Sequence, residues 1–317
     1  MPINIVRFEH DNHTRWGVIR DNRITPVPGD YATTGDFIRC TTPAALAALD
    51  SETLDRSAVK LLSPVTQNQQ FVCQGANYRQ HMIESGMDPD VKTYNMIFTK
   101  ASGCIVPGDS DVIRPRMVQY LDYEIELGLI LRKAIHGPVQ VTDNNLHEYV
   151  AGAVIVNDYS ARDVQIPQMQ FYKGKSFRTF GPVGPWLTLL DREDFHALRN
   201  LQLKLTVNGQ IRQNDTTANL VYGPAETLAE LSHVQDFDAG DLLATGTPAG
   251  CALSVPSPAK QKFAALLPEK KKWEIFLKVQ SARSQYLKVG DVVEASIRSV
   301  DGRVDLGVQR NRIVAQR

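Results

Sequence analysis

Short apolar runs separated by tight-turn signals recur along this chain, and they restrict it to a fold built mainly from β-strands. An alternating run at 201–207 meets Asn208-Gly209, and a run at 292–300 meets Asp301-Gly302. These dipeptides readily adopt the positive backbone angles that two-residue hairpin turns require. Apolar runs near the N-terminus are likewise separated by Asp-Asn pairs. The pattern predicts hairpins at both ends of the chain.

Helical patterns are few. The expected helices are 44–55, 76–85 and 225–233. The segment 61–65 resembles a strand that runs into a linker, so we place a boundary there. We therefore expect a mainly β protein with a few helices, divided into a small N-terminal β domain (1–65) and a catalytic domain (66–317).

Bulk composition excludes several classes of function. Lys and Arg together number 35, as do Asp and Glu, so the formal net charge is zero and favours neither nucleic acid nor an anionic membrane. No apolar run approaches the roughly 18 residues of a membrane span, and the N-terminus lacks the pattern of a signal peptide. The four cysteines are scattered, which argues against a structural zinc site and favours the reducing cytoplasm.

Acidic residues alternate with apolar ones over 121–130. In a strand, Asp122, Glu124 and Glu126 share one face. Same-face neighbours lie about 7 Å apart, so Glu124 and Glu126 can reach one ion between them. Alternation alone favours a plainer interpretation, in which these acids face water on a half-exposed sheet.

A third acid changes that balance. The apolar run 150–157 predicts a strand covered on both faces, and it ends at Asp158. Three neighbouring carboxylates repel one another unless a cation lies between them. An all-oxygen ligand set suits Mg²⁺, Mn²⁺ or Ca²⁺ better than Zn²⁺.

Seven motifs follow one another between about residues 70 and 300. They are GANYRQHMIE (75–84), DYEIEL (122–127), NDYSARDVQ (157–165), GKSF (174–177), GPVGPW (181–186), TGTPAG (245–250) and LKVGDVVE (287–294). Together they resemble the catalytic domain of the fumarylacetoacetate hydrolase family. The resemblance implies a mixed β-sandwich roll and identifies Glu124, Glu126 and Asp158 as the metal ligands. Some relatives add an upstream aspartate, but residues 73–77 carry no acid here, which implies the three-ligand branch.

The resemblance also assigns the remaining site residues. His81 and Glu84 match the catalytic dyad, and their spacing places them on one helix face, which is also typical of a plain surface pair. Lys175 matches the lysine that stabilises a developing oxyanion. Arg162, Gln165 and Thr247 match substrate contacts, although Arg162 could instead pair with Asp163 and Thr247 could belong to an ordinary turn. Lys100 resembles a family lysine of uncertain role.

These parts imply chemistry on a small 2-oxo acid. The leading hypothesis is hydrolysis of a C–C bond in an acylpyruvate-type dicarbonyl acid through an enolate that the ion stabilises. The alternatives are an isomerase or decarboxylase of a related acid, a lyase or dehydratase acting on sugar-derived oxo acids, and a catalytically silent binding protein of the same fold. The family further suggests a homodimer.

The segment 252–286 departs from the family pattern. It separates two motifs that are nearly adjacent in typical relatives, and it carries Lys270-Lys271-Lys272 among aromatic and aliphatic residues. Pro268 is expected to divide it into two short helices. The plainest interpretation is a surface excursion with one apolar face on the core. A lid, an oligomer contact and membrane docking are the alternatives. We expect it to alter substrate choice and to leave the metal chemistry intact.

Overall fold

The computed structural model describes residues 1–256 and 266–317, and its strands form two main layers. Within that part of the chain, the larger sheet has a continuous path of ten strands. In spatial order they are β4 (Leu54–Asp55), β3 (Arg23–Pro26), β2 (His13–Arg20), β1 (Ile3–His10), β15 (Leu187–Leu189), β12 (Val150–Asn157), β11 (Ile125–Leu131), β18 (Leu242–Ala244), β6 (Phe71–Gly75) and β7 (Met96–Lys100). Three short strands join it from the side: β5 (Lys60–Leu62) on β1, β14 (Gly181–Val183) on β12, and β8 (Ile105–Pro107) on β14.

A second sheet covers one face of the first. Its order is β17 (Gln210–Thr216), β16 (Leu201–Val207), β19 (Val292–Ser299), β20 (Asp305–Ala315) and β9 (Val112–Arg114). The two predicted hairpins are confirmed, because Asn208-Gly209 joins β16 to β17 and Asp301-Gly302 lies between β19 and β20. Apolar side chains of β11, β12, β16 and β19 meet in one core between the sheets. The protein is mainly β with a few helices, as predicted.

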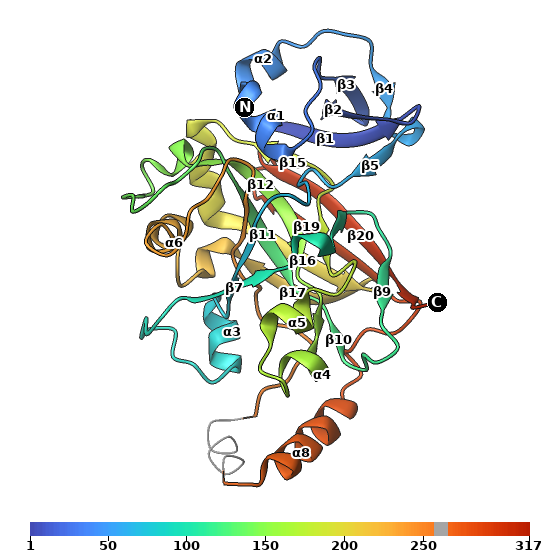
Figure 1. Ribbon diagram of the computed structural model, residues 1–317, viewed down its shortest axis with the longest axis vertical. Helices are drawn as coiled ribbons and strands as arrows, with labels where there is room; N and C mark the ends of the chain where they lie inside the picture. Colours follow the sequence, from blue (N-terminus) through green and yellow to red (C-terminus); the bar gives the residue numbers. More distant parts are fainter. Residues whose placement is uncertain (257–265) are drawn as a thin grey trace.

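The N-terminal strands are continuous with the larger sheet. Ile3 and Ile5 of β1 pair with Leu189 and Leu187 of β15, and the blue N-terminal unit therefore lies directly above the central strands (Figure 1). A second core packs side chains of these first strands against the opposite face of β12 and β18. Both faces of β11 and β12 are thus buried, which confirms the expectation for 150–157 and removes the half-exposed alternative for 121–130.

The described helices are short and peripheral. They are α1 (Thr34–Cys40), α2 (Pro43–Ala47), α3 (Arg79–Glu84), α4 (Arg162–Gln165), α5 (Phe171–Lys175), α6 (Pro224–Leu231) and α8 (Glu269–Ser281), with 3-10 turns η1 (Arg56–Ala58), η2 (Ser102–Cys104), η3 (Leu146–Glu148), η4 (Arg192–Asn200) and η5 (Thr217–Asn219). The helix predicted over 44–55 is present only in its first part, as α2, and residues 54–55 form β4 instead. A capping box between Thr33 and Asp36 starts a separate helix, α1, before residue 44. Thr42 then caps the short helix α2. None of the described helices is long and apolar enough to cross a membrane.

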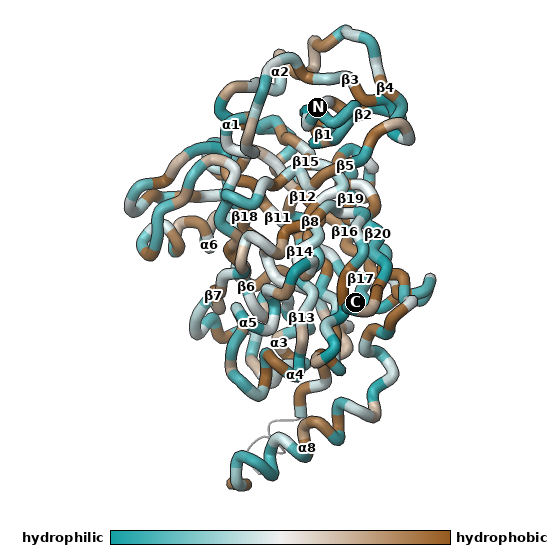
Figure 2. Tube along the Cα trace, turned by 45° about the vertical axis from the view of Figure 1, so that its right-hand side comes forward, coloured by the Kyte–Doolittle hydropathy of each residue, from teal (hydrophilic) through white to brown (hydrophobic). Residues whose placement is uncertain are grey.

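Of the segment 252–286, α8 (Glu269–Ser281) lies at the end of the molecule opposite the N-terminal unit (Figures 1 and 2). The first of its two predicted helices lies outside the described residues, and the second is α8, which begins after Pro268. The expected apolar face on the core is not present in α8. Gln280 is its only buried residue, and Ile275, Leu277 and Val279 are each more than a third exposed.

Candidate metal and substrate site

The predicted acidic strand is interrupted where the site forms. β10 (Leu121–Asp122) pairs with β13 (Ser160–Ala161), whereas β11 begins at Ile125 and pairs with β12. Tyr123 and Glu124 lie between the two strands, yet the predicted alternation persists. Leu121, Tyr123, Ile125, Leu127 and Leu129 lie in one core, whereas Asp122 and Glu124 both bond Arg162. Asn157 Oδ1 accepts a hydrogen bond from the Glu124 N–H (3.0 Å), and the Asp158 N–H donates to the Glu124 carbonyl (2.8 Å). These bonds place Glu124 beside the end of β12.

The three predicted ligands converge. One carboxylate oxygen from each of Glu124, Glu126 and Asp158 lies within 4.8 Å of the others, and all three residues are buried. Glu124 lies beside the end of β12 through its backbone hydrogen bonds with Asn157 and Asp158, and β11 itself presents Glu126. The cluster therefore has the oxygen donors and the spacing that a divalent cation requires.

Two lysines and an arginine neutralise part of this charge. Lys175 Nζ donates to Glu124 Oε2 (2.6 Å) and Asp158 Oδ2 (2.5 Å), and Lys100 Nζ donates to Asp158 Oδ1 (2.5 Å). Arg162 Nη2 bonds the other oxygen of Glu124. Burial alone raises the pKa of Glu124, but the charges of Arg162 and Lys175 outweigh it and lower the pKa to about 2. Glu124 is therefore ionised at neutral pH.

Glu126 lacks such compensation. Among the described residues it forms no ion pair, and its one hydrogen bond comes from the Gly246 N–H (2.9 Å). Burial first, and then the charges of Asp158 and Glu124, raise the pKa of Glu126 well above its ordinary value. A buried carboxylate without a cation is costly, and a divalent ion in the cluster would remove that cost. This feature fits a resident metal ion.

Arg162 and Gln165 lie together beside the cluster. Arg162 Nη1 donates to Gln165 Oε1 (2.7 Å), and Arg162 Nε donates to Asp122 Oδ2 (2.8 Å). The alternative partner, Asp163, instead accepts the Gln119 N–H. Sequence reasoning did not identify Asp122 as the arginine's partner. Thr247 is also at the site, but its hydroxyl already donates to the Ile125 carbonyl (2.9 Å) and accepts from Gln213 (2.8 Å).

The expected dyad is not joined in this structure. The charges of both Glu124 and Glu84 act on His81, although Glu84 itself is exposed at the end of α3. The buried His81 Nδ1 has no hydrogen-bond partner, so Glu84 does not orient the ring. Burial is the main influence on the ring and lowers the pKa of His81, which leaves the imidazole neutral at pH 7.

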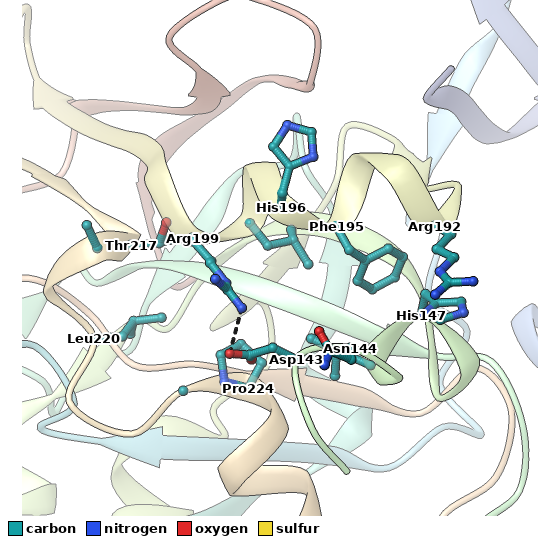
Figure 3. Close-up of a pocket in the computed structure, with 14 residues that line it drawn as sticks. Asp143, Asn144, His147, Arg192, Phe195, His196, Arg199, Thr217, Leu220 and Pro224 are labelled. Atoms are coloured by element: carbon teal, nitrogen blue, oxygen red, sulfur yellow. Dashed lines mark hydrogen bonds and ion pairs between the residues drawn. The ribbon is translucent and has the colours of Figure 1, made fainter.

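A hollow of about 640 Å³ lies away from the acids, between η3, η4 and η5 (Figure 3). Its lining residues do not include any member of the acid cluster. Arg199 and Asp143 point toward each other there and form an exposed ion pair of 2.7 Å. Screening by water weakens such a pair, so the buried acid cluster is the better candidate for chemistry.

The two-sheet fold and the buried acid cluster together define a β-rich protein with three acidic residues that could hold a metal ion. The chain belongs to the fumarylacetoacetate hydrolase family, whose C-terminal domain matches residues 70–314, and an N-terminal domain described as Rv2993c-like matches residues 4–64.

Named relatives fall into more than one reaction class. An oxaloacetate tautomerase from Bacillus subtilis is 34% identical over 205 residues, which is 64% of this chain and 66% of that protein. A fumarylacetoacetate hydrolase from Exiguobacterium antarcticum superposes with a TM-score of 0.75 at 28% identity, covering 99% of this chain and 100% of the other. A Sphingobium maleylpyruvate hydrolase, solved with manganese and pyruvate, gives 0.70 at 22% identity with the same coverage and shows the fold alone.

Proposed function

We propose that this protein is a metal-dependent enzyme that interconverts the keto and enol forms of a small 2-oxo acid of the oxaloacetate type. The observation that carries this proposal is the buried cluster of Glu124, Glu126 and Asp158, in which Glu126 lacks a cation of its own. A divalent ion held by these three side chains would act as a Lewis acid on the substrate's ketone oxygen and stabilise the enolate. The tautomerase among the relatives supports this reaction class.

The chain's own residues supply the rest of the chemistry. The neutral His81 imidazole can take a proton from the carbon beside the ketone and deliver it to the oxygen that was the ketone's, which gives the enol, and it can carry out the reverse transfer. Arg162, with Gln165 beside it, can bind a substrate carboxylate through its charge. Lys175 can donate to the developing oxyanion, where one fixed donor is worth about 10²-fold or more in rate.

Hydrolysis of an acylpyruvate, the leading hypothesis from the sequence, is the second candidate. The hydrolase from Exiguobacterium antarcticum supports it. It requires water to be activated by His81 with Glu84 orienting the ring, and in this structure no bond joins those two side chains. Tautomerisation needs only a proton carrier at His81, so the observed geometry favours it.

One pair of assays tests both candidates. Enol-to-keto conversion of oxaloacetate is followed by ultraviolet absorbance, and acetylpyruvate cleavage by coupling the released pyruvate to lactate dehydrogenase. Each assay is run with Mg²⁺ or Mn²⁺ and again with EDTA. We expect EDTA-sensitive tautomerisation that exceeds cleavage. Faster cleavage would select the hydrolase, and no turnover in either assay would overturn both.

A further inference from the structure

Asp122 is a fully buried aspartate at the edge of the site. Its Oδ1 accepts the backbone N–H groups of Tyr123 (2.9 Å) and Ala252 (2.7 Å). Its Oδ2 accepts the Leu253 N–H (3.0 Å) and Arg162 Nε (2.8 Å). One carboxylate thus holds both the first residues of the segment 252–286 and the arginine that lies against Glu124.

The two ends of that segment are fastened to each other. Gln280 of α8 donates to the Ser254 carbonyl (2.9 Å) and accepts the Ser254 N–H (3.3 Å). Arg283 Nε donates to the Ala252 carbonyl at 2.5 Å. The Leu287 N–H then donates to Leu121 of β10 (2.9 Å). A displacement of α8 would therefore also move the backbone N–H groups of Ala252 and Leu253, which donate to Asp122.

In the described chain Arg162 has two carboxylate partners, Glu124 and Asp122. Only Asp122 lies outside the acid cluster. Glu124, the other partner, is needed by the ion that we propose. A guanidinium held by Asp122 keeps its position when Glu124 is engaged elsewhere, and a preorganised arginine binds a carboxylate with less loss of entropy.

From these contacts we infer that Asp122 is a positioning residue through which the segment 252–286 sets the enzyme's affinity for its 2-oxo acid. The inference rests on the proposed function, in which Arg162 binds the substrate carboxylate. Under this inference the segment changes KM through the single buried side chain of Asp122. Binding of the ion and the rate of proton transfer stay unchanged.

The test is a double-mutant cycle with Asp122→Asn and Gln280→Ala. The matched control is Asp241→Asn, since Asp241 is another buried aspartate that accepts two backbone N–H groups, from Gln70 and Asp238, away from the acids. The measurements are KM and kcat for oxaloacetate, the affinity of the Mn²⁺-loaded protein for oxalate, and hydrogen exchange of the Ala252 and Leu253 amides in metal-free protein.

We expect Asp122→Asn to raise KM and weaken oxalate binding by about tenfold or more, with kcat within about threefold and faster exchange at both amides. Gln280→Ala should raise KM about threefold alone and have no further effect beside Asp122→Asn. Additive effects, or an equal effect of Asp241→Asn, would overturn the inference. If Asp122→Asn does not fold, an unchanged KM in Gln280→Ala overturns it alone.

Failure of the proposed function has a different signature. In that case the wild-type protein turns over no oxaloacetate, but oxalate affinity and amide exchange still report whether Asp122 links the segment to Arg162. Coupled changes in both readouts support the link without turnover, and independent changes overturn it.

Discussion

Lys175 Nζ lies 2.5 Å from Asp158 Oδ2, so a buried ammonium hydrogen-bonds directly to one of the three carboxylates that are proposed to hold a metal ion. The two residues come from different elements, α5 and the end of β12. Burial by itself lowers the pKa of Lys175, but the charges of Asp158 and Glu124 outweigh it and raise the pKa. The lysine is therefore cationic and would compete with a bound metal ion for the same oxygens.

The first prediction concerns that competition. Lys175→Met should lower turnover by about 100-fold or more because the donor to the oxyanion is lost. It should leave Mn²⁺ affinity unchanged or tighter, because a competing cation is removed. Calorimetric titration with Mn²⁺ and steady-state kinetics check the two halves. Lys173→Met is the control, since Lys173 lies on the same helix and is exposed. A large loss of Mn²⁺ affinity in Lys175→Met would contradict the prediction.

A second prediction follows from the uncompensated charge of Glu126. A group whose pKa is raised in the folded state favours folding below its unfolded pKa, and that contribution is lost as pH rises through the folded pKa. Near neutral pH, Glu126 therefore opposes folding of the metal-free protein. Glu126→Gln should raise the melting temperature of the metal-free protein by a few degrees. This increase should become larger as pH rises from about 4.5. The same substitution should weaken Mn²⁺ binding more than about tenfold. Thermal melts across pH check this, and a lower melting temperature at pH 7 would argue against it.

Proton release gives an independent prediction. Because the pKa of Glu126 is raised by burial and by Asp158 and Glu124, the carboxyl must lose its proton when an ion binds. Mn²⁺ binding should release up to about one proton and tighten as pH rises. Calorimetry in buffers with different ionisation enthalpies counts the protons. Equal heats in all buffers would show that Glu126 is already ionised.

The dyad provides a fourth prediction. His81→Asn should lower tautomerisation by about 100-fold, whereas Glu84→Gln should change it less than about threefold, because no hydrogen bond joins Glu84 to the ring. Since burial lowers the pKa of His81, kcat/KM should rise with pH through an apparent pKa below 6.5, and that limb should vanish in His81→Asn. Exposed His233→Asn is the control. Equal losses in the His81 and Glu84 variants would favour the hydrolytic dyad.

The sequence by itself determined the β-rich fold and the hairpins at Asn208-Gly209 and Asp301-Gly302, and its motifs, through their resemblance to the family, identified the three acids that converge. Each rests on local physics or on a motif of contiguous residues. A turn dipeptide carries its own backbone preference, and the apolar run before Asp158 requires burial on both faces. The resemblance rested on the seven motifs, which occur along the chain in the order that the family shows.

Only the tertiary structure decided how these pieces act on one another. No local pattern shows that Asp122 bonds Arg162 forty residues away, or that hydrogen bonds with Asn157 and Asp158 hold the Glu124 backbone beside the end of β12. Nor does spacing show that the buried His81 Nδ1 has no hydrogen bond from or to Glu84. Charges and hydrogen bonds act through space, so a buried site depends on which segments the fold brings together.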